Sequence, residues 1–179
     1  MRTADENGKA GIASRSGKEK ELVVCFTGHR RIDAQEALRL PAALDAVIRE
    51  LYDRGARVFR AGGAMGFDTV AALKVLEVKK EFPNIRLELF LPCRDQTRKW
   101  YLYDRLVYAR ILRRADRTEY ASDSYTPYCM LARDRELVTG SDVCVAYLKK
   151  PTGGTAYTVQ YAESVGVRVV RLANVGQDA

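Results

Sequence analysis

Two glycine-rich segments of this sequence have the residue types and the spacing that suit phosphate binding. The first is GGAMGFD, residues 62–68, and the second is GGT, residues 153–155. Each follows a short apolar run and leads into a stretch with helical spacing of apolar residues. Glycine lets a ligand approach the backbone closely, and the first turn of a helix offers unpaired N–H groups and a partial positive charge. The two segments therefore predict an anion-binding site.

Neither segment is a standard nucleotide fingerprint, because GGAMG differs from GxGxxG and no GK[ST] follows it. Taken alone, GGAMG is explained equally well by a tight turn between a strand and a helix. Two such loops at one edge of one sheet form a better anion pocket than either alone, and threonine hydroxyls add further donors. The predicted phosphate-binding residues of the two loops are Gly62, Gly63, Ala64, Met65, Gly66, Gly153, Gly154, Thr155 and Thr158.

Polar residues also stand close to these loops and after the first apolar run. Asp68 begins a predicted helix, where a carboxylate complements the helix dipole; a hydrogen bond to a ribose hydroxyl is its alternative role. Gly28, His29 and Arg30 follow residues 21–27. His29 suits phosphate contact or acid–base work, or a structural hydrogen bond to the backbone at a helix entry. We include all four residues in the predicted ligand site.

A third group of candidates follows the apolar run at residues 85–92. Arg94 and Gln96 stand directly after it and are expected to face the ligand, because polar residues at the ends of parallel strands line the crevice. Trp100 is the only tryptophan, and with Tyr101 and Tyr103 it has two interpretations. These rings either stack on a nucleotide base or belong to the core.

The elements that must position these residues alternate along the chain. Apolar runs predict strands, and apolar residues at helical spacing predict the helices between them. Such alternation is typical of a doubly wound α/β fold, here with a mainly parallel five-stranded sheet and helices on both faces. Ligands of such folds bind outside the carboxyl ends of the strands, near the point where strand order reverses. The predicted strands are 21–28, 56–63, 85–92, 141–148 and 167–173, and the predicted helices are 34–54, 66–80, 95–114, 127–139 and 153–166.

Composition narrows the class of protein. The 179 residues suit one domain, which we expect over 21–179 after a polar, disordered tail at 1–20. The net charge of +7 suits an anionic ligand, whether a nucleotide or a nucleic acid. The sequence shows neither a signal peptide nor an apolar stretch of membrane-spanning length, so we expect a cytoplasmic protein without membrane partners. The four cysteines form no CxxC pair, and the chain has one histidine. We therefore expect no metal site and no cofactor.

Six segments together resemble the YpsA-like proteins, bacterial and phage members of the SLOG superfamily that are related to Smf/DprA and to the LOG phosphoribohydrolases. The resemblance covers residues 21–172 and implies a Rossmann-like domain whose glycine loops bind a nucleotide or a nucleotide-derived small molecule such as ADP-ribose or a nucleoside monophosphate. It also implies a role as sensor or regulator and a homodimer. The segments are CFTGHRR, AGGAMGFDTVAA, LPC with the following Gln and Trp, SYTPYCMLARDRELV, SDVCVAY and GGTAYTVQYA.

The chain matches the LOG enzymes at one functional residue and differs from them at another. Their conserved arginine is matched by Arg133, which is the best catalytic candidate and is expected to reach a phosphate. Their catalytic glutamate falls on Thr158, which has no carboxylate, so the resemblance puts LOG-type catalysis in doubt. An N-glycosidic hydrolase remains an alternative, with Asp68 or Asp123 as the replacement carboxylate. Binding of single-stranded DNA, as in DprA, is a further alternative that the modest charge favours less.

Overall fold

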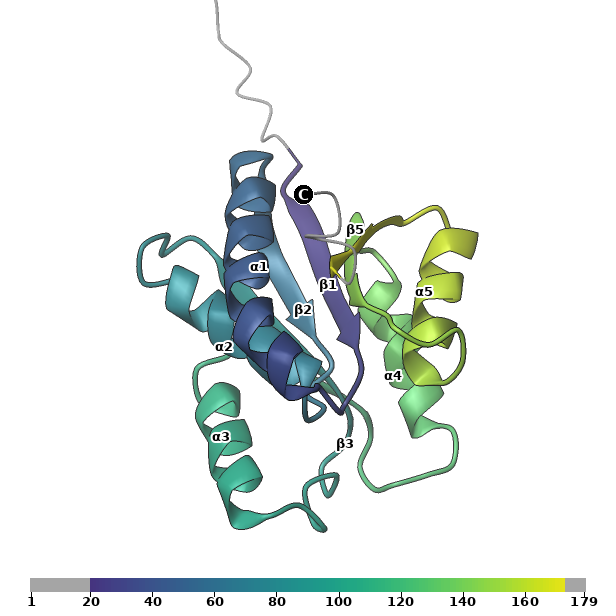
Figure 1. Ribbon diagram of the computed structural model, residues 1–179. Coiled ribbons are helices and arrows are strands. Elements are labelled where there is room, and N and C mark those ends of the chain that lie inside the picture. Colours follow the sequence, from purple (N-terminus) through teal and green to yellow (C-terminus); the bar gives the residue numbers. More distant parts are fainter. Residues whose placement is uncertain (1–19, 173–179) are drawn as a thin grey trace, which may run out of the picture.

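The computed structural model of the protein describes residues 20–172 (Figure 1). The tail predicted over residues 1–20 lies outside this range, except for Lys20. The strands are β1 Leu22–Gly28, β2 Ala56–Ala61, β3 Arg86–Cys93, β4 Arg117–Ser122, β5 Val143–Tyr147 and β6 Arg168–Arg171. The helices are α1 Ala34–Asp53, α2 Phe67–Val78, α3 Leu102–Leu112, α4 Cys129–Val138 and α5 Gly154–Ser164.

All strands pair in parallel, in the order β4-β3-β2-β1-β5-β6. The chain builds outward from β1 to β4, then crosses back to place β5 on the other side of β1. Strand order therefore reverses between β1 and β5, which lie in register from Val24 opposite Val143 to Gly28 opposite Tyr147. This arrangement confirms the predicted doubly wound α/β fold.

The strand count is a correction, because the sheet has six strands and the sequence predicted five. The additional strand, β4, lies within the segment that was expected to be a loop. Its sequence, RTEYAS, contains no apolar run, and none of its residues is fully buried. Edge strands pair on one side only and need no continuous apolar sequence, so hydrophobic patterning gives little signal for them.

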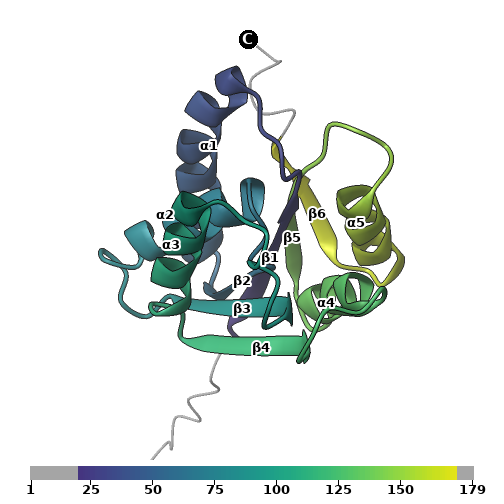
Figure 2. The ribbon, with the colours of Figure 1, turned by 90° about the horizontal axis from the view of Figure 1, so that it is seen from below.

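Alternate residues of the central strand enter two separate cores. Val24 and Phe26 pack with Leu44 and Ile48 of α1 and with residues of α2. Cys25, which lies between them, belongs to the opposite cluster with residues of α4 and α5. Figures 1 and 2 accordingly show α1, α2 and α3 on one side of the sheet and α4 and α5 on the other. Both faces of β1 are therefore buried, as its continuous apolar sequence predicts.

Local signals explain where the helices begin. Asp33 caps α1 by accepting a hydrogen bond from the Glu36 N–H at 2.9 Å. Helix α3 begins at Leu102, later than the predicted residue 95, because residues 94–99 form turns after β3.

Within residues 20–172 no helix combines the length and the apolar character needed to cross a membrane.

Candidate anion-binding site

A cavity of about 280 Å³ opens at the carboxyl end of the sheet, where strand order reverses between β1 and β5. Figure 2 looks onto this end of the strands. Four segments form the walls: the end of β1, the β2–α2 connection, one face of α4 and the first turns of α5. The lining residues are Phe26, Thr27, Gly28, His29, Arg30, Ala64, Asp68, Met130, Arg133, Asp134, Leu137, Gly154, Thr155 and Thr158. The structure thus brings the two glycine loops together.

The glycines of the first loop serve close packing around this cavity. A β-carbon at Gly62 would lie 1.7 Å from Nη1 of Arg133, so only glycine leaves room for the guanidinium. Gly66 has a φ of +77°, and a β-carbon there would lie 2.3 Å from the carbonyl oxygen of Arg30. Of the predicted residues in this loop, Ala64 and Asp68 line the cavity, whereas Gly62, Gly63, Met65 and Gly66 do not.

The two helix starts at the cavity differ in how far other groups of the protein already occupy them. Both α2 and α5 follow a glycine and have no side-chain cap. At α2 the Phe67 N–H donates to the His29 carbonyl at 3.1 Å, and the preceding Ala64 N–H donates to Asp68 Oδ2 at 3.2 Å. At α5 a β-carbon added to Gly153 would meet no atom within 4 Å, and Gly154 and Thr155 face the cavity. The open start of α5 is therefore the better place for an anion.

Arg133 lies at the base of the cavity and is only 7% exposed. Its Nη1 donates to the Gly62 carbonyl and lies 3.5 Å from Asp68 Oδ2. Its Nε lies 2.9 Å from Asp134 Oδ1, but the geometry is not that of a hydrogen bond, so this buried N–H has no hydrogen-bond partner among the described residues. Arg133 therefore brings a buried positive charge to the wall of the cavity, where two carboxylates share it.

The two carboxylates beside Arg133 are buried as well, with Asp68 6% and Asp134 9% exposed. Burial raises the pKa of Asp68 to about 6, although Arg133 and the Ala64 N–H partly offset this effect. Burial also raises the pKa of Asp134, opposed by Arg133 and by the Thr158 hydroxyl. The cavity therefore offers carboxyl groups that take up protons more readily than an exposed aspartate does.

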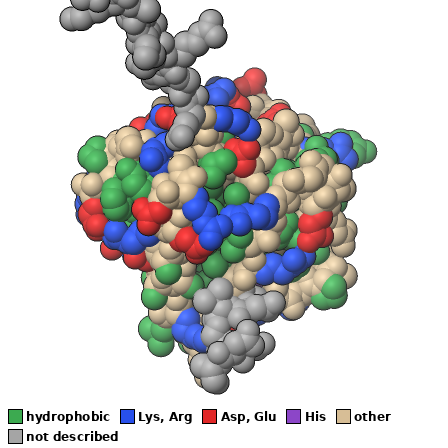
Figure 3. Space-filling view, turned by 90° about the horizontal axis from the view of Figure 1, so that it is seen from above, with side chains coloured by type: hydrophobic (Ala, Val, Ile, Leu, Met, Phe, Trp, Pro, Cys, Tyr) green, Lys and Arg blue, Asp and Glu red, His purple; other side chains and the backbone are tan. Residues whose placement is uncertain are grey.

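His29 and Arg30 line both this cavity and a second, cationic hollow of about 560 Å³. The His29 Nε2 accepts a hydrogen bond from the Lys149 N–H at 2.9 Å, and its pKa is lowered by burial and by Lys150 and Lys149. The imidazole is therefore neutral near pH 7. Among the described residues no carboxylate pairs with Arg30. At the opposite end of the molecule, in contrast, Lys and Arg side chains lie beside Asp and Glu side chains (Figure 3).

Three further predicted residues lie outside the cavity. Arg94 forms an exposed pair with Asp123 at 3.1 Å and stacks over Tyr120 at 4.4 Å. Gln96 lines a neighbouring hollow and donates to the Gly63 carbonyl at 3.4 Å. Gly153 immediately precedes the cavity-lining turn of α5. The remaining residue, Thr158, does line the cavity, and its hydroxyl donates to the Gly154 carbonyl at 2.9 Å.

Sequence reasoning missed the contribution of Met130 and Asp134 from α4. A run of charges such as that of residues 133–136 is typical of a solvated helix face, yet Arg133 and Asp134 are buried while Arg135 and Glu136 are exposed. The signal was present in the spacing of the cavity-lining residues, which is i, i+3, i+4 and i+7 from Met130 to Leu137.

Within residues 20–172 no cluster of three or more His, Cys, Asp or Glu side chains could hold a metal ion.

Residues 24–168 match the YpsA family model, described as the YspA SLOG family. A UPF0398 protein of Staphylococcus epidermidis is 32% identical over 87 residues, 49% of this chain and 46% of that relative. The SPbeta prophage-derived protein YoqJ of Bacillus subtilis is 27% identical over 139 residues, 70% of this chain and 81% of that relative. The match therefore spans about half the length of the staphylococcal relative.

Two solved structures share the fold. DNA processing protein A (DprA) of Streptococcus pneumoniae superposes with a TM-score of 0.61 and 16% identity, covering 84% of this chain and 50% of that chain. DprA of Helicobacter pylori gives a TM-score of 0.61 and 19% identity, covering 84% of this chain and 64% of that chain. At this level of identity the likeness concerns the fold alone.

Proposed function

Because this chain belongs to the YpsA family of SLOG proteins, we propose that it binds a nucleotide or nucleotide-derived ligand whose phosphate sits at the first turn of α5. The observation that carries this proposal is the open start of α5 facing the buried guanidinium of Arg133 across one cavity. Backbone N–H groups and the helix dipole favour a negative charge there. Arg133 and Arg30 supply the compensating positive charge. Binding without turnover would suit a role as sensor or regulator.

The carboxylates of the cavity set a condition on this binding. Asp68 and Asp134 carry negative charge near the same space, and Arg133 lies between them. A phosphate therefore binds best where it is far from these oxygens and close to the α5 amides. Because the pKa of Asp68 is raised to about 6, acidification removes one of these charges and strengthens anion binding.

The test is a thermal-shift screen with AMP, ADP-ribose, NAD, cyclic nucleotides and short single-stranded DNA. A ligand of the folded state raises the Tm by roughly 5 to 10 °C at about 100 times its Kd. The Gly154→Asp variant adds a carboxylate at the proposed phosphate position, where a β-carbon meets nothing closer than Asp134 Oδ2 at 4.0 Å. The variant should lose the shift.

The matched control is Gln160→Asp, which places the same charge on the exposed side of α5. This variant should keep the shift. If Gly154→Asp is folded and keeps the shift as well, the phosphate position is wrong. If only single-stranded DNA shifts the Tm, with an affinity that falls steeply as salt increases, the ligand is a nucleic acid, the class of ligand that DprA of H. pylori binds.

The raised pKa of the two buried carboxyl groups favours a second candidate function, the hydrolysis of a nucleotide N-glycosidic bond. A carboxyl group that is partly protonated near neutrality can act as a general acid, and its neighbour can stabilise an oxocarbenium-like transition state. Asp68 lies in the cavity as this function requires, whereas the Asp123 side chain is 93% exposed and pairs with Arg94. Release of ribose 5-phosphate from AMP, abolished in Asp68→Asn, would identify this activity. Binding without release supports the first function.

A further inference from the structure

A hollow of about 400 Å³ adjoins the cavity and shares Met130 with it. Its lining differs in chemistry from that of the cavity, because it contains the Trp100 and Tyr125 rings as well as polar groups. We infer that this aromatic hollow binds the base of the ligand whose phosphate sits at α5. The inference rests on the proposed function and adds to it the position of the second half of the ligand.

The size of the cavity supports this division. Its volume of about 280 Å³ lies at the lower end of the roughly 300 to 1,000 Å³ typical of small-molecule sites. A nucleotide whose phosphate occupies the cavity can place its base in the adjoining space. The hollow on the other side contains Arg31, Lys149 and Lys150 together with Asp33, which pairs with Lys149 at 3.1 Å. Its tyrosine, Tyr147, is only 1% exposed, so that hollow offers no ring on which a base could stack.

The two rings that line the aromatic hollow differ in how the protein holds them. Trp100 packs edge-on against Tyr108, with ring centroids 5.5 Å apart and an interplanar angle of 78°. Tyr125 comes from the β4–α4 connection and is 63% exposed, and its ring has no aromatic or cationic partner among the described residues. Trp100 is thus held in place from one side by the protein, while Tyr125 is free to pack against a ligand. Aromatic side chains in this situation stack on nucleotide bases.

Polar contacts connect the aromatic hollow to the first glycine loop. The Gln96 side-chain amide donates to Tyr108 Oη at 3.0 Å and to the Gly63 carbonyl at 3.4 Å. Asp95 Oδ1 accepts a hydrogen bond from the Tyr125 N–H at 3.2 Å, which fixes the backbone that carries the Tyr125 ring. The residues around the aromatic hollow are therefore connected to the same loop that forms one wall of the phosphate cavity.

The single tryptophan of the chain allows a direct test. AMP, ribose 5-phosphate and adenosine are titrated against the full chain, and binding is followed both by calorimetry and by Trp100 fluorescence. We expect AMP to bind most tightly and to quench the fluorescence. Ribose 5-phosphate should bind more weakly and leave the fluorescence unchanged, because it has no base to stack.

Two variants separate stacking from folding. Tyr125→Ala removes an exposed ring but keeps the backbone hydrogen bond to Asp95, and it should weaken AMP binding by about tenfold without changing the affinity for ribose 5-phosphate. Tyr103→Ala removes a ring of similar exposure, 75%, that does not line the hollow, and it should leave both affinities unchanged.

The outcomes distinguish the two proposals. If AMP and ribose 5-phosphate bind equally well and neither changes the Trp100 fluorescence, the aromatic subsite is wrong and the phosphate site stands. If neither compound binds, the proposed function fails for this ligand class and the subsite fails with it. If Tyr125→Ala and Tyr103→Ala weaken AMP binding alike, the effect is not stacking in the hollow, and the inference is overturned.

Discussion

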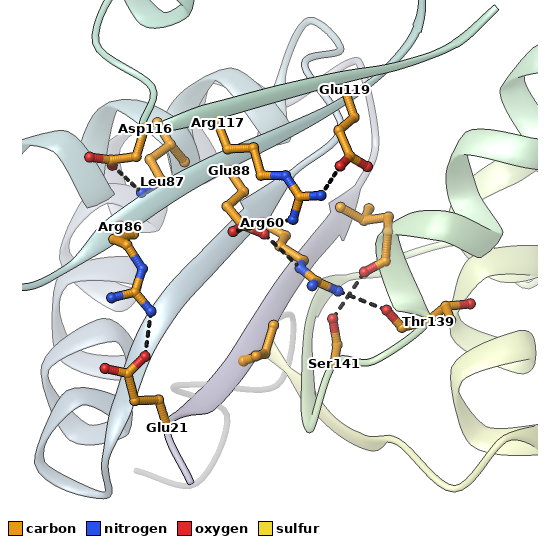
Figure 4. A network of polar contacts seen from close by, with 12 residues as sticks. Glu21, Arg60, Arg86, Leu87, Glu88, Asp116, Arg117, Glu119, Thr139 and Ser141 are labelled. Carbon is orange, nitrogen blue, oxygen red and sulfur yellow. Dashed lines mark hydrogen bonds and ion pairs between the residues drawn. The ribbon is translucent and has the colours of Figure 1, made fainter. Parts of the chain in front are cut away.

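Two arginines, Arg60 and Arg133, both lie on the α4 side of the sheet and both have mostly buried side chains, but their surroundings differ. Arg60 donates from Nε to Glu88 Oε2 at 3.1 Å and from Nη1 to the Thr139 carbonyl at 2.7 Å (Figure 4). Its guanidinium lies over the Phe90 ring, 5.0 Å from the ring centroid. Arg133 binds one carbonyl, lies near two carboxylates, and keeps one buried N–H without a hydrogen-bond partner among the described residues.

The difference shows how the same residue type serves structure in one place and a ligand in another. The charge of Arg60 is balanced by Glu88, which also lies 3.9 Å from Arg117. Arg60 lines none of the cavities around the proposed site. Arg133 lines the cavity at the switch point of the sheet. Its guanidinium lies 3.5 Å from Asp68 and 2.9 Å from Asp134, and both carboxylates line the cavity as well. We propose that Arg60 serves stability and that Arg133 serves ligand binding.

Replacing each arginine with methionine gives the largest expected effects and tests the comparison most strongly. Arg133→Met should lower the free energy of unfolding by about 3 to 5 kcal/mol, because it leaves the buried carboxylates of Asp68 and Asp134 without their partner. Arg60→Met should lower it by less, because Arg117 still lies 3.9 Å from Glu88. Only Arg133→Met should abolish AMP binding, measured by calorimetry below the Tm of each variant. Equal loss of binding in both variants would mean that Arg133 acts through stability alone.

The pH dependence of stability gives the next largest effect. The pKa of Asp68 is raised from 3.8 in the unfolded chain to about 6 in the folded protein, so the folded state binds more protons between these values. The contribution of Asp68 to stability is fully present below about pH 4 and is lost as the pH rises through 6. The loss amounts to about 3 kcal/mol.

Asp68→Asn should remove this part of the pH dependence. Urea unfolding at several pH values from 4 to 7 measures it, and the variant should gain stability relative to the wild type as the pH rises through this window. A difference between the two proteins that stays constant with pH would show that Asp68 is ionised normally, and it would remove the reason to consider it as a general acid.

Glycine substitutions on two walls of the cavity sharpen the comparison further. Gly62→Ala should lower the free energy of unfolding by about 1 to 3 kcal/mol, because its methyl group would overlap Arg133 Nη1. Gly154→Ala is the control on the other wall of the cavity, where the nearest atom is 4.0 Å away, and it should be neutral or slightly stabilising. Thermal melts measure both. A tolerated Gly62→Ala would show that Arg133 is not held as closely as the structure has it.

The smallest effect is expected at the exposed pair of Arg94 and Asp123, whose side chains are 64% and 93% exposed. Arg94→Ala should change the free energy of unfolding by less than about 1 kcal/mol, because exposed ion pairs contribute little. It should leave AMP affinity unchanged as well, since Arg94 lies outside the cavity. A large loss of affinity would restore Arg94 to the ligand site that the sequence predicted.

Much of the fold could be predicted, because five strands carry apolar runs that a buried parallel sheet requires. Strand β4 could not, since RTEYAS pairs only with β3 and its side chains remain partly exposed. The start of α3 was predicted too early, because residues 94–100 include polar and aromatic residues whose spacing also suits a helix. These errors occur where burial is incomplete and the periodic signal is therefore weak.

The position of the site was also predictable from topology, and its internal contacts were not. Strand ends and glycine loops indicated that residues near 28, 64 and 154 would meet at one edge. Nothing in the sequence showed that Asp68 accepts a hydrogen bond from Ala64, or that Asp134 enters the cavity from α4. Both facts depend on the packing of α2 and α4 around Arg133, which couples residues distant along the chain.

A ¹⁵N NMR titration with AMP locates the bound phosphate residue by residue. We expect the amide signals of Gly154 and Thr155 to shift with the largest amplitude. Signals at the opposite end of the strands, such as those of Val23 and Leu87, whose N–H groups bind Asp142 and Asp116, should stay in place. Large shifts at Val23 and Leu87 with silent Gly154 and Thr155 would contradict the proposed phosphate position.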